Sequence, residues 1–157
     1  MALVSSSLAS GLIAAEDPPA ETSAVAADRF SSAFISYFKT AQTTLGPVNP
    51  LTCDLPSAKQ ALVGGITGAF NTTGGNAVAN LIGVAILAYL NAGPASLFFD
   101  TATSVAIVTP LGTYMSSIST PVAQQQAAKN AVAAAIQTWL ASGVQVTFPG
   151  PNVSGIT

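Results

Sequence analysis

The sequence predicts a mainly α-helical fold in which three related helical hairpins pack as a small bundle. Alanine-rich segments carry apolar residues at helical spacing, and stretches rich in glycine, proline and threonine separate them. An aromatic residue closes the longer segment of each hairpin, at Tyr37, Tyr89 and Trp139, and these residues recur about every 50 positions. The expected repeat units span residues 5–42, 57–92 and 111–142 of one domain over 1–157.

The first unit combines a short helix with a longer one. Residues 5–15 form the short helix, which stops before the consecutive prolines Pro18 and Pro19 because proline disrupts a helix interior. The longer helix is expected over 22–42, where aromatic and aliphatic residues recur at helical spacing and either Thr22 or Ser23 can cap the N-terminus.

The second unit follows a proline-rich loop over residues 44–56. A helix is expected from Ser57 to about Phe70, then a turn over 71–76 with the sequence NTTGGN. The next helix, 77–91, has no charged residue, and Gly93-Pro94 follows it as a stop.

The third unit contains helices expected over 111–119 and 121–142. Pro121 suits a first helical turn, since the missing N–H would be unsatisfied there anyway. Gly143 suits a helix C-cap, because glycine adopts the left-handed conformation without strain.

Short β segments are expected near 96–108 and at 144–148, before a proline- and glycine-rich end of the C-terminal segment 143–157. The alternation of Val144, Val146 and Phe148 is typical of a strand. Such a strand can pair within the chain, with 96–99 or 104–108, or can extend the sheet of a neighbouring subunit. The sequence leaves both pairings open.

The chain is short of charge. Only 6% of its residues are charged and 50% are hydrophobic, against about 25% charged in an average soluble protein. A surface of neutral hydroxyls, amides and small residues is cheap to desolvate, because ions cost far more to bury. This composition favours a subunit buried in an oligomer or larger assembly over a weakly acidic soluble monomer. Four basic residues are too few for a phosphate-binding patch, so we expect no nucleic-acid partner.

The residues needed for most catalytic and metal sites are missing. The chain has no histidine, which removes the commonest general base and the usual nucleophile pairs. Glu16, Asp17 and Glu21 cluster in a turn but match no calcium-loop spacing, so a solvated acidic turn is expected there. Cys53 has no partner in the chain and is interpreted as an inert thiol. We expect no catalytic residue, metal, cofactor or small-molecule substrate.

The uncharged segment 77–92 is interpreted as a buried helix and not as a membrane span. It has 16 residues and contains Asn80 and Asn91, whereas a span needs about 20 apolar residues. The N-terminus lacks the positive charge of a secretion signal, so none is expected.

The segments LVSSSLASGLIAA, ALVGGITGAF and AVAAAIQTWL resemble small Ala-rich virion structural proteins of tailed bacteriophages. The resemblance implies a subunit of the neck, tail or baseplate, found in the virion after assembly in the host cytoplasm. It also implies that the partners are other virion proteins, further copies of the chain, or both.

Six residues are candidates for partner contact. Three are the aromatics that end the long helices, and three lie on the C-terminal strand; they are Tyr37, Tyr89, Trp139, Val144, Val146 and Phe148. Two other functions stay open, namely a small membrane-active protein such as a holin and a surface adhesion module.

Overall fold

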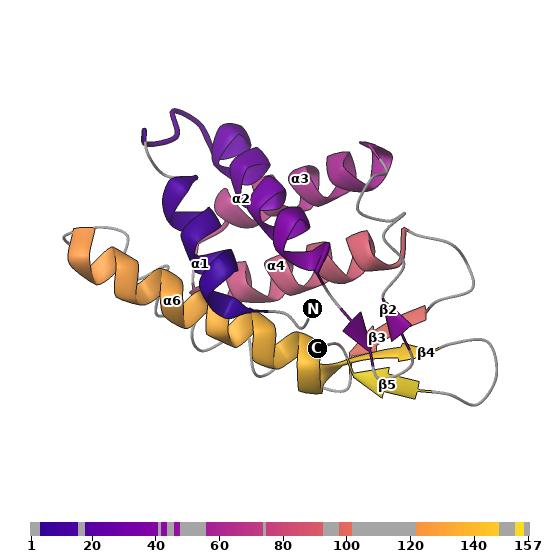
Figure 1. Ribbon diagram of the computed structural model, residues 1–157. Helices are drawn as coiled ribbons and strands as arrows, with labels where there is room; N and C mark the ends of the chain where they lie inside the picture. Colours follow the sequence, from indigo (N-terminus) through magenta and orange to yellow (C-terminus); the bar gives the residue numbers. More distant parts are fainter. Residues whose placement is uncertain are drawn as a thin grey trace.

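The computed structural model describes residues 4–15, 18–40, 42–43, 46–47, 56–73, 75–92, 98–101, 122–147 and 153–155. Within these ranges the fold is mainly α, and five helices pack together (Figure 1). The helices are α1 (Ser5–Ala14), α2 (Ser23–Phe38), α3 (Pro56–Phe70), α4 (Gly75–Leu90) and α6 (Val122–Thr138). A π-helical turn, Trp139–Gly143, continues α6 into strand β4.

A threonine cap explains where α2 begins. The Thr22 side chain accepts a hydrogen bond from the Val25 N–H at 3.3 Å, so Thr22 is the N-cap of α2. The helix ends at Phe38, earlier than the predicted boundary at 42, and Gln42 already belongs to strand β1. The predicted helix at 111–119 lies outside the described residues.

The five helices pack side by side in the order α6, α1, α2, α3 and α4. The short helix α1 packs against both α6 and α2, and α3 packs against both α2 and α4. Figure 1 shows α6 alongside α1 on one side of the bundle, with α3 and α4 on the other.

Two small sheets accompany the helices. Strands β1 (Gln42–Thr43) and β2 (Gly46–Pro47) form an antiparallel pair. Strands β3 (Phe98–Thr101), β4 (Val144–Thr147) and β5 (Val153–Gly155) form an antiparallel sheet in the order β3-β4-β5. This sheet lies at one end of the bundle, just beyond the end of α6 (Figure 1). The predicted segment at 104–108 lies outside the described residues.

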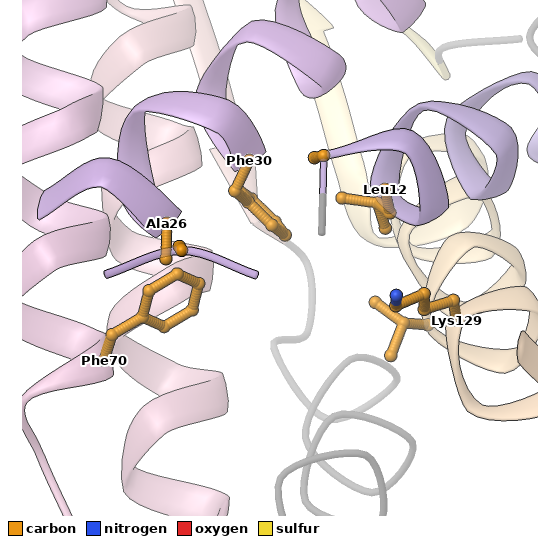
Figure 2. Close-up of a pocket in the computed structure, with 8 residues that line it drawn as sticks. Leu12, Ala26, Phe30, Phe70 and Lys129 are labelled. Carbon is orange, nitrogen blue, oxygen red and sulfur yellow. The ribbon is translucent and has the colours of Figure 1, made fainter. Parts of the chain in front are cut away.

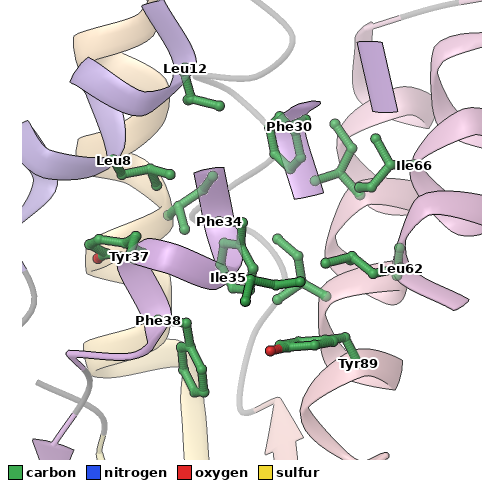
Figure 3. Close-up of a cluster of buried hydrophobic side chains, with 14 of the residues drawn as sticks. Leu8, Leu12, Phe30, Phe34, Ile35, Tyr37, Phe38, Leu62, Ile66 and Tyr89 are labelled. Carbon is green, nitrogen blue, oxygen red and sulfur yellow. The ribbon is translucent and has the colours of Figure 1, made fainter. Parts of the chain in front are cut away.

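In the described part of the chain, one hydrophobic core joins the five helices. Its centre is aromatic: Phe34 stacks on Phe38 with ring centroids 5.8 Å apart, and the edge of Tyr89 meets Phe34 at 6.1 Å. Aliphatic side chains from α1 and α3, including Leu8 and Leu62, fill the space around these rings (Figure 3). Because alanine-lined helices bury little area per contact, these large side chains supply much of the hydrophobic burial.

Candidate functional site

A small pocket lies between the hairpins. Its volume is about 60 Å³. Phe30 and Phe70 lie on one side, and Leu12 and Lys129 lie on the other (Figure 2). Lys129 is buried, and the rest of the lining is apolar. This pocket provides no constellation of groups for catalysis.

The long helices bury equivalent positions. When residues 77–91 of α4 are placed beside 127–141 of α6, buried and exposed positions coincide wherever both side chains are described. When α2 is placed beside α4 so that Tyr37 matches Tyr89, the burial of matched residues differs only where one of the two is half-buried. The three helices therefore present the same stripe to the core, although their side chains differ.

The three terminal aromatics lie at the same place in this register, inside the core. Tyr37, Tyr89 and Trp139 are at most 1% exposed. The structure thus places them within the chain, and not on the subunit surface that their sequence positions suggested. The reason is geometric: each follows the buried stripe of its helix, so the helix turns it inward.

The two described hairpins share a second internal feature, a close glycine–alanine contact. A Cβ placed on Gly11 of α1 would lie 3.1 Å from the Ala33 Cβ of α2. A Cβ placed on Gly65 of α3 would lie 2.6 Å from the Ala85 Cβ of α4. Ala33 and Ala85 occupy equivalent positions in the register of the long helices. In both hairpins the first helix therefore approaches the second closely through the same kind of contact.

For Val144 and Val146, two of the candidate strand residues, the structure gives the position of the backbone. Val144 and Val146 lie in β4, where Val144 is opposite Thr101 and Val146 is opposite Phe99. The other edge of β4 pairs with β5. Both edges of β4 are thus used within the chain, so its backbone is not an open edge for a neighbouring sheet. Phe148 lies outside the described residues.

Charged side chains on the described surface gather on the first half of the bundle. Asp28 of α2 and Lys59 of α3 form an ion pair at 3.2 Å, with both side chains substantially exposed. Arg29 donates to the carbonyl oxygens of Ala15 and Pro18, which ties α2 to the turn after α1. By contrast, the exposed described positions of α4 and α6 carry no charged side chain.

The outer face of α4 was not identified as a surface from the sequence. Val84 is 65% exposed and Leu81 is 39% exposed, and Ala77 and Ala88 are exposed on either side of them. The absence of charge in segment 77–92 predicts a buried helix, but it also marks the exposed face of α4 as neutral. In the structure, one side of α4 is buried and the other is an exposed neutral surface.

One buried polar group is shifted in its acid–base behaviour. Burial raises the pKa of the Tyr37 phenol above its usual value, because desolvation penalises the phenolate. Among the residues that the structure describes, the hydroxyl has no hydrogen-bond partner. Burying the Tyr37 hydroxyl without a partner lowers the stability of the core.

The acidic residues and the cysteine considered in the sequence form no metal site among the described residues. Glu21 is exposed, while Glu16, Asp17 and Cys53 lie outside the described residues. Across the described ranges no three acidic, cysteine or histidine side chains are grouped to hold a metal ion. In the same part of the chain, no helix combines the length and apolar character needed to cross a membrane.

Comparison with protein-family models, with curated proteins and with solved structures found no match to this chain.

Proposed function

We propose that the chain is a structural subunit of a tailed-phage virion, placed in the neck, tail or baseplate and acting through protein–protein packing. It takes up its position by assembly in the host cytoplasm. Its partners are other virion proteins, further copies of itself, or both, and it acts on no small-molecule substrate.

The neutral outer faces of α4 and α6 carry this proposal. The exposed described residues of these helices are alanine, asparagine, glutamine and threonine, together with Leu81 and Val84. A protein that stays dispersed in water normally surrounds itself with charge. Neutral small side chains suit a contact surface, because their burial requires little desolvation and lets helices approach closely.

We also propose that the bundle consists of three related hairpins, with units at 5–42, 57–92 and 111–142. The common burial register of α2, α4 and α6 supports the repeat, as do the equivalent glycine–alanine contacts of the first two units. In such a repeat the inward positions are constrained by packing, whereas the outward positions can be adapted to partners.

Mass spectrometry of phage particles purified by density gradient tests the virion assignment. We expect peptides of this chain to sediment with the particles, at a constant ratio to a major structural protein across the gradient. An abundant host cytoplasmic protein serves as the control for contamination. If the chain is present in the lysate but falls away from the particles with that control protein, the proposal is wrong.

A further inference from the structure

The pocket between the hairpins has a buried cation at one wall and hydrocarbon on the others. Lys129 of α6 is 4% exposed, and Leu12 and Val132 beside it are also buried. Phe30 and Phe70 form the opposite wall. In Figure 2 the Lys129 side chain runs from α6 toward these residues, with its nitrogen at the leading end. The described lining therefore places one positive charge inside an apolar space.

A buried ammonium group is unusual, because lysine is rarely removed from water unless its charge is compensated. Its three N–H donors allow it to bind a ligand while it also contacts groups of the chain. A carboxylate complements this group, since N–H donors form short, strong hydrogen bonds with a charged oxygen. The apolar walls in turn suit a hydrocarbon chain. The pocket therefore fits a molecule with a carboxylate at one end and an aliphatic chain at the other.

The volume of the pocket limits the length of such a molecule. The pocket measures about 60 Å³, which is less than half of the roughly 150 Å³ of an engineered cavity that holds benzene. A ligand should therefore be smaller than benzene, with about four carbon atoms or fewer. A longer carboxylate could enter only if the helices moved apart.

The mouth of the pocket is held in place. Three alanines of the lining, Ala15, Ala20 and Ala26, are half-buried, so the pocket reaches the surface there. Arg29 donates hydrogen bonds to the carbonyl oxygens of Ala15 and Pro18, which fixes the turn that carries two of these alanines. A site whose walls are already in place loses less free energy to ordering when it binds a ligand.

From these observations we propose that the pocket binds a short aliphatic carboxylate, with its oxygens on the Lys129 ammonium and its chain against Phe30 and Phe70. The ligand contacts side chains of α1, α2, α3 and α6, so its binding stabilises the folded bundle. It is bound and not converted, because the rest of the described lining is hydrocarbon. The site belongs to one copy of the chain and does not depend on the virion assignment.

Titration of the purified full chain with sodium butyrate tests the site. At constant ionic strength, butyrate should cause saturable NMR shifts of the Leu12 and Val132 methyl groups. The Kd should be on the order of 1 mM, because so small a ligand makes few contacts. Butanol has the chain without the charge, and formate has the charge without the chain, so each should bind at least about tenfold more weakly. Shifts that do not saturate, or equal affinity for butyrate and either of these molecules, would overturn the proposal.

Two variants with matched controls locate the site. Lys129→Met removes the charge but keeps an unbranched apolar side chain, and it should weaken butyrate binding at least about tenfold. Lys59→Met, at a partly exposed lysine of α3, makes the same change in net charge and should leave the affinity unchanged. Ala26→Leu narrows the mouth and should also weaken binding, whereas Ala24→Leu on the exposed side of the same helix should not.

Circular dichroism checks that each variant is folded. If Lys129→Met does not fold, the comparison of butyrate, butanol and formate on the unaltered chain still decides the question. Undiminished binding of butyrate by a folded Lys129→Met chain would contradict the proposal. Equal losses in Lys129→Met and Lys59→Met would likewise show that butyrate responds to net charge and not to this pocket.

Discussion

The hairpins α1–α2 and α3–α4 are alike inside and different outside. Both use a glycine on the first helix to contact an alanine on the second helix, and both bury a tyrosine near the end of the second helix. Outside, α2 carries Asp28 and Arg29, whereas the described exposed positions of α4 are neutral. The comparison shows that packing within the chain constrains the inward residues. The outward residues are not constrained in this way, so they can differ between the hairpins.

The two hairpins also differ in how closely their helices approach each other. The glycine–alanine contact is tighter in α3–α4 than in α1–α2, by the positions of the added Cβ atoms at 2.6 Å and 3.1 Å. The looser hairpin has additional polar links, since Arg29 of α2 donates to carbonyls of the turn that joins its two helices. Four sets of substitutions test these differences.

Tyr89→Ala should have the largest effect on stability. Tyr89 is fully buried and lies against Phe34 and Phe38, so its loss should lower the free energy of unfolding by about 3–5 kcal/mol. Urea unfolding followed by circular dichroism measures this change. Val84→Ala, on the exposed face of the same helix, is the control and should cost less than about 0.5 kcal/mol. Similar losses for the two variants would contradict the central position of Tyr89.

Gly65→Ala should destabilise the chain by about 1–3 kcal/mol, because its Cβ would overlap that of Ala85 and force the helices apart. Gly64→Ala is the matched control, since nothing lies within 4 Å of a Cβ at that position. It should stabilise α3 by up to about 1 kcal/mol through helix propensity. The change in stability for Gly11→Ala should lie between those of the other two variants, because the contact of Gly11 is looser than that of Gly65. Thermal unfolding of the three variants gives the order, and a gain for Gly65→Ala would refute the close approach.

Tyr37→Phe should raise the free energy of unfolding by about 1 kcal/mol, because it removes a buried hydroxyl without a hydrogen-bond partner. It should also change the pH dependence. The pKa of Tyr37 is raised in the folded chain, so above about pH 10 the unfolded chain loses this proton while the folded chain keeps it. Stability is therefore full below pH 10 and falls as the pH rises further. Denaturant titrations between pH 8 and 11 should show a weaker fall for the variant; an unchanged slope would exclude Tyr37 as a cause.

Asp28→Asn should have the smallest effect. The ion pair with Lys59 is exposed to solvent and to salt, so its loss should cost less than about 1 kcal/mol at low ionic strength and less still at high salt. The pair joins α2 of the first hairpin to α3 of the second at an exposed surface. Unfolding measured at two salt concentrations tests this, and a large loss that salt does not reduce would show a role beyond the surface.

The sequence predicted the helices well where local signals were strong. The helix at Pro56–Phe70 ends where the turn residues Asn71 and Thr72 begin, and Thr22 caps α2 as expected. Boundaries shifted where local signals were weak. α4 begins at Gly75, because a glycine in the turn sequence can join the first helical turn when packing favours it.

The candidate interface was harder to infer than the helices. The aromatic residues that end the long helices were conspicuous in the sequence, yet Tyr37, Tyr89 and Trp139 are all buried. Leu81 and Val84 were inconspicuous because they stand in a segment that is apolar on every side. Hydropathy alone does not tell which side of such a helix faces the core, since both sides have the same composition.

The sequence by itself determined the helical class, the low charge and the regular recurrence of small residues and aromatics, because these depend on composition and local spacing. Only the tertiary structure decided which residues face inward, that Gly65 meets Ala85 and that β4 is a central strand. Those outcomes depend on contacts between residues far apart in the chain. When neutral residues occupy both sides of a helix, the neighbouring helices decide which side is buried and which remains a surface.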